Sequence, residues 1–517
     1  LKTALLSEAQ AAKRSKDATL FVHRLIGRIE EVERDRPSHP LVDAVFSSGP
    51  TLRAKIDSDL AVSTDQLNES QKEALTKAHE NKVLFILGAA GTGKTRVLSR
   101  IVGDFVTAGE TTLICCHTKA AVDHATGRLE PSVRDGSCFK AKTFASAVMD
   151  QDTTSVQNVV IDEASMASLP HILFLTSLAS KRVIFCGDPM QLPPIARSGE
   201  LSDKWLKRDI FAHQSGTEDI RELYAWNDKN RDISVLLREQ FDIPRQIFSI
   251  ANYLYYGNRL NCQSRTKGII SFIDTSKQNP PLTGTRSSPV NDAHAEIVSN
   301  QVGEALEKRT LTADTIGILT PFRAQQQYLK DLLSKRGISS DVTVDTVHTF
   351  QGRKKSCIIF DLTASAVDHT FQNLGGVADN ENQAVRMLNT ALSRCRIREG
   401  VEGRLIVIAN YQHIKDRYPG SAVLQFLNRI RFQTDTLTDD ESISRFQQTT
   451  ETLIKEIRED QPGIIKSLAS IETASKQAVE RLIWSYCDVI PRLIQLCNRL
   501  SPSFIQTDGT RKHLEQL

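Results

Sequence analysis

Residues 87–95 read LGAAGTGKT, and this stretch decides the fold of the chain around it. The apolar run VLFI comes directly before it, and RVLSRIVGDFV follows with the spacing of an amphipathic helix. In a strand, loop and helix of this kind, backbone N–H groups surround phosphate oxygens, the lysine reaches the outer phosphates and the threonine hydroxyl binds Mg²⁺. The stretch therefore predicts a nucleoside-triphosphate site made by Gly88, Gly91, Gly93, Lys94 and Thr95.

Two further stretches add groups that a triphosphate site needs. VVIDEAS (159–165) places Asp162 at the end of an apolar strand, where its carboxylate can hold Mg²⁺, and Glu163 beside it can polarise the attacking water. LNESQKEAL (67–75) places Gln71 shortly before the first strand, and its amide can read the donor and the acceptor of an adenine edge. Taken alone, Gln71 is better interpreted as a helix-surface residue.

The composition indicates a multidomain globular protein. At 517 residues the chain is long enough for two to four domains, and 65 basic against 62 acidic residues give a net charge of +3. This balance neither supports nor excludes a nucleic-acid partner, because a basic groove can lie within a neutral total. No apolar run is long enough to span a membrane, so we expect no membrane partner. The nine cysteines contain no C-x-x-C pair, which favours a reducing, cytoplasmic location.

Short apolar strands alternate with helical stretches in two consecutive series. VLFIL, TLICC, VVI and RVIFC form the first series, and IISFI, TIGILT, SCIIFDL and RLIVIAN form the second. Such series predict an α/β protein with two tandem parallel-sheet domains, each with helices on both faces of its sheet. The predicted division is an N-terminal helical arm (1–63), a first domain (64–235), a second domain (236–417) and a C-terminal helical appendage (418–517).

The stretch VIFCGDPMQLPPI (183–195) narrows the class of protein. A strand that ends in Gly-Asp, followed by Gln191 and Leu-Pro-Pro, resembles motif III of the superfamily 1 helicases. The branch it most resembles contains the nonsense-mediated-decay RNA helicase, the Dna2-type enzymes and the nidovirus helicases. Further similar blocks follow in the family's order: CCHTKAAVDHATGRL (115–129), AKTFASAV (141–148), IGILTPFRAQQQYL (316–329), VDTVHTFQGRKKSCIIF (344–360) and LNTALSRCR (388–396).

The resemblance implies two RecA-like domains that use ATP and Mg²⁺ to move along single-stranded DNA or RNA, generally from 5′ to 3′. Under it, Gln71 contacts adenine, and Lys94, Thr95, Asp162 and Glu163 act as described above. Gln191 senses the γ-phosphate or its water, and Arg394 reaches across from the second domain as an arginine finger. Gly352 of the QG pair completes the nucleotide site.

The same resemblance implies residues that grip the strand. They are Thr118, Thr143, Thr320, Arg323, Thr346 and His348. Hydroxyl, amide and guanidinium groups suit phosphate contacts, which hold the backbone without reading the sequence of bases. Considered one by one, these residues have plainer interpretations. Each threonine can cap a helix, the arginine can be solvated, and the histidine can be hydrogen-bonded within the protein.

Two positions depart from the family pattern. Relatives commonly carry a QYRMHP-like block whose arginine contacts the γ-phosphate, whereas this chain reads QFDIP (240–244), with Asp242 at that place. A carboxylate repels a phosphate, so we expect Arg238 or Arg245 to take over, and we favour Arg245. Relatives also carry QGxE with the glutamate near the ribose, whereas Lys354 stands here. The loss of that acceptor predicts weaker binding or weaker discrimination of the sugar.

Two alternatives to a helicase remain open from the sequence. The chain is alternatively a nucleic-acid-gated ATPase switch that clamps a strand or remodels a partner without processive unwinding, or a binding scaffold without activity. The intact GKT, DEAS and SRCR blocks argue against the scaffold. The helical N- and C-terminal regions are candidate docks for a protein partner.

Overall fold

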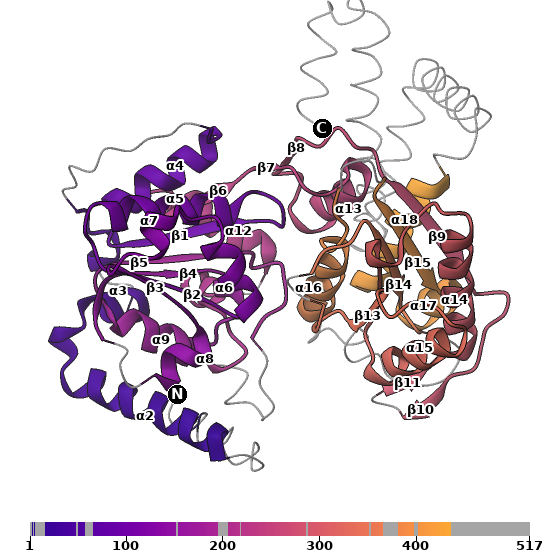
Figure 1. Cartoon of the computed structure of the whole chain (residues 1–517), viewed down its shortest axis with the longest axis horizontal. Helices are drawn as coiled ribbons and strands as arrows, with labels where there is room; N and C mark the ends of the chain where they lie inside the picture. Colours follow the sequence, from indigo (N-terminus) through magenta and orange to yellow (C-terminus); the bar gives the residue numbers. More distant parts are fainter. Residues whose placement is uncertain are drawn as a thin grey trace, which may run out of the picture. The chain divides into compact units, whose positions relative to one another are not determined.

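The computed structural model describes residues 3, 5, 16–47, 50–56, 66–150, 154–194, 205–217, 219–285, 288–350, 353–364, 381–397 and 402–435 (Figure 1). All of them belong to one compact unit, Leu1–Asp435. Of the predicted C-terminal appendage, residues 436–517 lie outside the described part.

The first sheet is parallel throughout and has six strands in the order β3-β2-β4-β5-β1-β6. The strands are β1 (Val83–Gly88), β2 (Thr112–Cys116), β3 (Phe139–Thr143), β4 (Val156–Ile161), β5 (Ala179–Gly187) and β6 (Ser234–Leu237). Every residue of β1 is buried, as expected for a strand covered on both faces. The predicted boundary after residue 235 falls inside β6.

Helices cover both faces of this sheet. Leu84 and Ile86 of β1 belong to one apolar cluster, whereas Phe85 and Leu87 belong to another, because successive strand side chains point to opposite faces. The first face packs against α4 (Glu69–Glu80), α5 (Lys94–Thr107) and α7 (Pro131–Arg134). The second cluster includes buried residues of α8 (Phe144–Met149), α9 (Leu169–Ser177), α11 (Ile210–Ser215) and α12 (Ile220–Lys229). Helix α6 (Lys119–Thr126) lies against β2 and β3.

The N-terminal region forms helices α2 (Lys16–Arg34) and α3 (Pro40–Ser47), which pack against the first domain. Helix α2 carries an apolar stripe of Leu25, Ile29 and Val32, and all three side chains are buried. Arg28 of this helix donates to the hydroxyl and the carbonyl of Ser177 at 2.7 and 2.9 Å. The arm is therefore fixed to α9 by an apolar stripe and a bidentate guanidinium.

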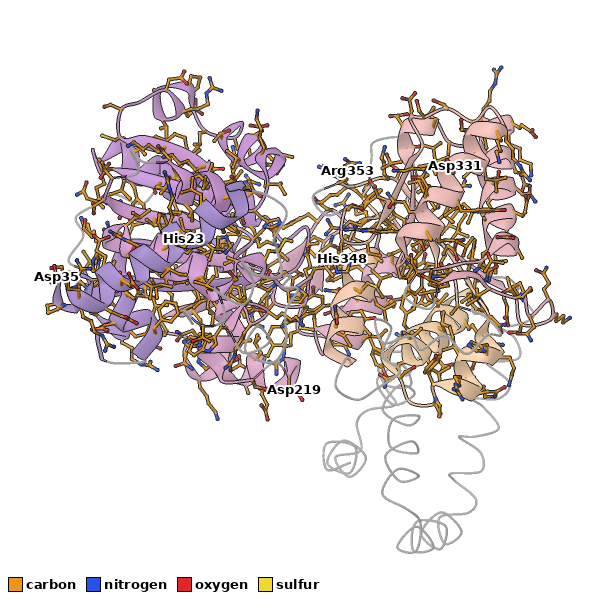
Figure 2. The ribbon with its side chains drawn as sticks, turned by 90° about the horizontal axis from the view of Figure 1, so that it is seen from below. His23, Asp35, Asp219, Asp331, His348 and Arg353 are labelled. Carbon is orange, nitrogen blue, oxygen red and sulfur yellow. The ribbon has the colours of Figure 1, made fainter. Side chains whose placement is uncertain are left out.

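The second sheet is also parallel, with five strands in the order β13-β12-β14-β15-β9. The strands are β9 (Ile269–Asp274), β12 (Ile316–Thr320), β13 (Thr343–Thr346), β14 (Cys357–Asp361) and β15 (Arg404–Ala409). Its faces are covered by α13 (Arg245–Tyr255), α14 (Asp292–Glu307), α15 (Arg323–Lys335), α16 (Glu381–Leu392), α17 (Tyr411–Arg417) and α18 (Ala422–Asp435). Figure 2 shows His348 and Arg353 on this part of the chain, together with Asp331 of α15. The predicted pair of RecA-like parallel-sheet domains is confirmed.

Short strands join these elements. β7 (Glu239–Gln240) pairs in parallel with β8 (Asn261–Cys262), and β10 (Thr283–Thr285) pairs antiparallel with β11 (Ser288–Val290). Strand β7 directly follows the first sheet, and the chain then enters α13. The segment between β7 and α13 contains Phe241 and Asp242.

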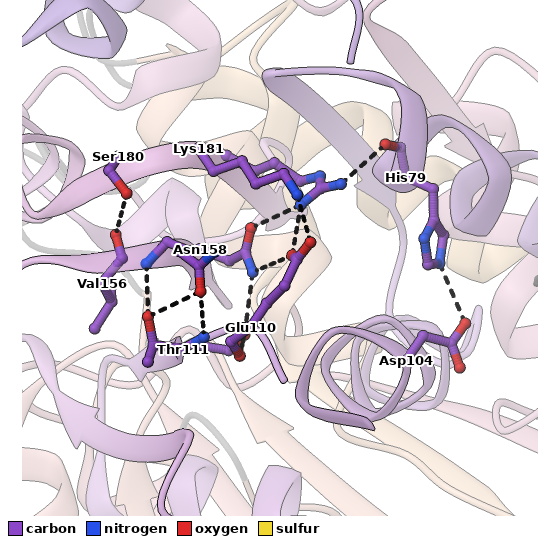
Figure 3. Close-up of polar contacts among 11 residues, drawn as sticks. His79, Asp104, Glu110, Thr111, Val156, Asn158, Ser180 and Lys181 are labelled. Atoms are coloured by element: carbon purple, nitrogen blue, oxygen red, sulfur yellow. Dashed lines mark hydrogen bonds and ion pairs between the residues drawn. The ribbon is translucent and has the colours of Figure 1, made fainter. Parts of the chain in front are cut away.

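A buried polar network ties the first sheet together near the beginnings of β2 and β5 (Figure 3). Arg182 has no exposed side-chain surface, and its guanidinium donates to Glu110 at 2.6 Å and to Asn158 at 3.1 Å. Asn158 in turn donates to Glu110 at 2.8 Å, and Lys181 also pairs with that carboxylate. The paired and hydrogen-bonded charges make burial of this arginine tolerable.

Candidate nucleotide site

The parallel arrangement brings the predicted site residues to one edge of the first sheet. β1 ends at Gly88, β4 is followed by Asp162, and β5 is followed by Asp188. Because β4, β5 and β1 are neighbours, the glycine-rich loop and both carboxylates emerge side by side. The carboxyl edge of such a sheet is where ligands bind in doubly wound folds.

The glycine-rich loop needs glycine at two positions. Gly91 and Gly93 have φ of +79° and +86°, which side chains rarely adopt. A Cβ on Gly93 would also lie 2.5 Å from Nε2 of Gln71. The loop is therefore a tight backbone cradle directly before the N-terminus of α5, where backbone N–H groups and the helix dipole favour an anion.

Lys94 is buried at the start of α5, and its Nζ donates to the carbonyl of Gly88 at 2.9 Å. Burial acts to lower the pKa of Lys94, but the carboxylates of Glu163, Asp188 and Asp162 outweigh it and raise the pKa. The ammonium is thus charged and held at the loop. Thr95 follows in the same helical turn and is half-buried.

The Asp-Glu pair lies in a buried, negatively charged environment. Burial, reinforced by the neighbouring Glu163, raises the pKa of Asp162 to about 7, with Lys94 acting in the opposite direction. Glu163 has a left-handed backbone, with φ of +51°, and its N–H donates to the Asp162 carboxylate at 2.9 Å. Its Oε2 is buried and has no hydrogen-bond partner among the described residues. A strained residue with an unsatisfied carboxylate oxygen is typical of a site that awaits a ligand.

Asp188 is a site residue that the sequence reasoning did not single out. It is buried after β5, and it accepts from Gln191 Nε2 at 2.9 Å, from the Tyr256 hydroxyl at 2.7 Å and from the Met190 N–H at 3.0 Å. Burial raises its pKa, and Lys94 opposes that shift. The sequence signal that could have identified Asp188 is its position directly after the apolar strand β5.

Arg394 links the two sheets' domains at this edge. It lies just beyond α16, is 4% exposed, and its Nη2 donates to Oε1 of Gln191 at 3.1 Å and to the Ser393 hydroxyl at 2.7 Å. Its Nε donates to the carbonyl of Thr390 at 3.1 Å. Burial lowers the pKa of Arg394, while Glu163 and Asp188 oppose that shift. The structure thus brings Lys94, Asp162, Glu163, Gln191 and Arg394 together.

Two more contacts of α16 join the domains. Asn389 Nδ2 donates to the carbonyl of Met190 and to the Tyr256 hydroxyl, each at 2.8 Å. Arg386 pairs with Asp209, and both side chains are buried at 4% and 0% exposure. Nothing in the local sequence spacing reveals these partners, because they are more than a hundred positions apart.

Gln71 lies beside the glycine-rich loop, but its amide already makes hydrogen bonds within the protein. It is 3% exposed, and its Oε1 accepts from the Asn68 N–H at 3.2 Å as part of a capping box. Its Nε2 donates to the carbonyl of Thr92 at 3.1 Å. Gln71 is thus neither a surface residue nor free, and one hydrogen and one lone pair of its amide remain for a base.

The two departures from the family pattern are in contact with each other. Lys354 Nζ donates to Oδ2 of Asp242 at 2.8 Å. The contacts described for Arg245 are with another segment: its N–H donates to the carbonyl of Thr266 and its Nε donates to that of Ser264. The second candidate, Arg238, is half-buried, and its backbone bonds Ser70 and Asn261. Gly352 lies outside the described residues.

The predicted strand-gripping residues of the first domain cap helices. Thr118 precedes α6 and accepts from the Ala121 N–H at 3.2 Å. Thr143 precedes α8 and accepts from the Ser146 N–H at 3.0 Å. Both stand at strand ends on the same sheet edge, so the capping interpretation holds for each and does not remove them from a nucleic-acid face.

The corresponding residues of the second domain differ in exposure. Thr320 is fully buried and its hydroxyl bonds that of Thr363 at 3.0 Å. Thr346 is 5% exposed and accepts from the Thr349 N–H at 3.3 Å. Arg323 is exposed at the start of α15, and burial together with this arginine lowers the pKa of the half-buried His348. Arg323 and His348 are therefore the most accessible residues of this second-domain set.

No described helix of this chain combines the length and the apolar character that crossing a membrane requires. The seven cysteines in the described part are all free.

Two family models match the chain, and both are described as an AAA domain. One matches residues 66–240 and the other residues 220–410. These ranges contain the first and the second sheet with their phosphate loop and α16.

Curated relatives match at low identity. The DNA replication ATP-dependent helicase/nuclease DNA2 of Gallus gallus is 24% identical over 378 residues, which cover 64% of this chain and 35% of the relative. The protein of the same name from Saccharomyces cerevisiae is 22% identical over 423 residues, which cover 68% of this chain and 26% of the relative. The chain therefore spans about a third of the length of these relatives.

Solved structures of viral helicases are also similar. An Arterivirus nonstructural protein 10 (helicase) in complex with DNA is 13% identical, with a TM-score of 0.36, over 66% of this chain and 64% of that one. The PRRSV helicase is 12% identical, with a TM-score of 0.35, over 67% and 55%. The two AAA domains and the Dna2-type relatives fit the resemblance of the ordered sequence blocks to the superfamily 1 helicases, with a Dna2-like relationship.

Proposed function

We propose that this chain is an ATP-dependent helicase or translocase that acts on single-stranded nucleic acid. The observation that carries the proposal is the hydrogen bond of 3.1 Å between Arg394 and Gln191. It joins a cation from the second domain to the loop that bears Asp188 beside Lys94. A site assembled from two domains couples the state of the nucleotide to the distance between those domains.

The residues present fit a triphosphate with Mg²⁺. The cradle around Gly91 and Gly93 leaves no room for side chains, and the buried Oε2 of Glu163 has no partner among the described residues. Thr95 and Asp162 offer the hydroxyl and the carboxylate that would hold Mg²⁺. When bound, the metal neutralises charge on the outer phosphates.

The chain's own groups supply the rest of the chemistry. Lys94 is charged and placed to bind the outer phosphates. Glu163 is placed to orient a water and accept its proton. Arg394 is placed to stabilise the charge that develops on the transferred phosphoryl group, and Gln191 couples it to Asp188.

Movement along a strand follows from this composite site. When both domains bind one triphosphate, the contacts from Arg394 and Asn389 draw α16 toward the loop after β5. Loss of the γ-phosphate weakens the connection between α16 and that loop. Arg323 and His348 in the second domain, and Thr118 and Thr143 in the first, then hold a strand alternately. We adopt the 5′ to 3′ direction from the resemblance, and we take DNA as the first substrate to test because the relatives are named as DNA replication enzymes.

Hydrolysis and strand displacement test the proposal. We expect ATP hydrolysis that single-stranded DNA or RNA stimulates, and displacement of duplexes with a 5′ tail but not with a 3′ tail. Lys94→Ala is expected to abolish both activities while it leaves the fold intact by circular dichroism. Hydrolysis that persists in Lys94→Ala would show that the site lies elsewhere.

A nucleic-acid-gated ATPase switch is the second candidate. The observation that favours it is the substitution of both a γ-phosphate arginine and a ribose carboxylate of the family pattern, at Asp242 and Lys354. Stimulated hydrolysis without displacement of either tailed duplex would select the switch over the helicase.

A further inference from the structure

Asp242 and Lys354 form an ion pair against the phosphate loop. Their side chains are half-buried, at 30% and 29% exposure, and Nζ lies 2.8 Å from Oδ2. The Cβ of Asp242 lies 2.9 Å from the position that a Cβ on Gly91 would occupy, and the neighbouring Phe241 N–H donates to the Gly91 carbonyl at 3.0 Å. The pair therefore lies directly against the glycine-rich loop, with the ammonium of Lys354 coming from the second domain.

The surroundings of the pair are strongly cationic. Although burial opposes it, Lys354 holds the pKa of Asp242 below its usual range, and Arg396 and Arg128 act in the same direction. Burial lowers the pKa of Lys354, Arg394 and Arg396 push it the same way, and Asp242 opposes them. His124 also faces this group, and burial and its cationic neighbours lower its pKa, so it is neutral at pH 7.

One carboxylate thus faces a group of cations, and the surplus positive charge favours an additional anion. An ammonium on a flexible stem suits an exchange of partners better than a guanidinium fixed in a fork. A γ-phosphate that enters the loop carries more negative charge than Asp242 and competes with it for Lys354. The contact described for the Arg245 guanidinium is with another segment, from Nε to the carbonyl of Ser264 at 3.3 Å.

We propose that Lys354 is a second cation from the second domain, in addition to Arg394, that binds the outer phosphate of the triphosphate, and that Asp242 holds Lys354 beside the loop until the triphosphate arrives. The two departures from the family pattern then compensate each other. A positive charge is retained at the phosphate, but it comes from position 354 instead of 242. This inference rests on the proposed function and specifies which residue distinguishes ATP from ADP.

Nucleotide binding to Lys354→Met and Asp242→Asn tests the inference. Affinities for ADP and for a non-hydrolysable triphosphate analogue are measured by equilibrium competition with Mg²⁺ present. Loss of one charge-assisted hydrogen bond predicts that Lys354→Met weakens triphosphate binding by about ten- to hundredfold and ADP binding by less than about twofold. Asp242→Asn removes the competitor and is expected to leave triphosphate binding unchanged or tighter.

Lys355→Met is the matched control, because the adjacent ammonium donates to the carbonyl of Asp314. It is expected to change neither affinity. A pair that only holds the fold would behave differently: both single variants would weaken both nucleotides equally, and the double variant would be no worse than either. That result would overturn the inference, as would a Lys354→Met protein that still prefers triphosphate like the wild type. A wild-type protein that binds neither nucleotide would instead overturn the proposed function.

Discussion

Nη2 of Arg394 and Oε1 of Gln191 lie 3.1 Å apart, so a guanidinium from the end of α16 is bound to the loop that follows β5. The same glutamine donates to Asp188 at 2.9 Å, and Asp188 accepts from the Tyr256 hydroxyl of the second domain at 2.7 Å. The chain of contacts therefore starts in the second domain, passes through the first and returns. We propose that a change at the phosphates is transmitted along these contacts.

Arg394→Ala is expected to slow hydrolysis while it leaves the affinity for ATP nearly unchanged. An arginine that acts on the transition state contributes about a thousandfold or more to the rate, and a ground-state contact contributes little. Single-turnover hydrolysis gives the rate, and equilibrium binding gives the affinity. Arg394→Lys is not expected to restore the rate, because an ammonium lacks the planar fork.

Arg353→Ala serves as the control for that experiment. Its guanidinium is 59% exposed and pairs with Asp345 at 2.9 Å, so hydrolysis is expected to stay at the wild-type rate. An Arg394→Ala protein that hydrolyses as fast as the control would remove this residue from the mechanism.

Asp162→Asn is expected to stabilise the nucleotide-free protein while it abolishes hydrolysis. Burial raises the pKa of Asp162 to about 7, above the value near 3.8 of an unperturbed aspartate. Stability is therefore lost as the pH rises from about 4 to 7, because the unfolded chain ionises first, and the full penalty is present above pH 7. Asparagine removes this penalty, so the gain is expected to be on the order of 1–3 kcal/mol at pH 8 and to vanish near pH 4.

Thermal denaturation without Mg²⁺, at pH 4.5 and pH 8, measures this effect. An equal melting temperature for Asp162→Asn and wild type at pH 8 would contradict the claim that ionisation of the buried Asp162 carboxylate lowers stability. Added Mg²⁺ is expected to raise the melting temperature of the wild type only, because the ligand is missing in the variant.

Glu110→Gln is expected to destabilise the first domain strongly, because it leaves Arg182 buried without a counter-charge. Breaking a buried ion pair on one side costs about 3–5 kcal/mol. Removing both charges in Glu110→Gln/Arg182→Met is expected to recover much of that loss. Urea denaturation of the three proteins checks it, and a double variant less stable than the single one would contradict the interpretation.

Much of the site was predictable because it is local in the sequence. The loop with Lys94 and the pair at Asp162 each follow an apolar strand, and parallel strands place such ends on one edge. Helical spacing likewise predicted the N-terminal helical arm, which the structure shows as α2 and α3. These features need only neighbouring residues to be recognised.

The partners across the chain were not predictable from local patterns. Asp242 and Lys354 looked like two separate defects, and only the folded chain shows that they bond each other at 2.8 Å. Asp188 was read as part of a motif, but its role depends on Tyr256, which lies 68 positions away. Local patterns in a single sequence do not indicate which side chains far apart in the chain contact each other after folding.

Arg323→Ala is expected to weaken binding to single strands and to reduce its dependence on salt. Arg323 is exposed at the N-terminal end of α15 beside His348, whereas Arg336, at the other end of the helix, pairs with Glu296 and is the matched control. Each phosphate contact to a single strand contributes about 0.7 to the slope of log affinity against log salt. Fluorescence anisotropy with a labelled oligonucleotide, at several salt concentrations, is expected to show that loss for Arg323→Ala and none for Arg336→Ala. Equal slopes for both variants and the wild type would exclude Arg323 from the strand-binding face, and the second domain would then have to hold the strand through His348 and backbone groups.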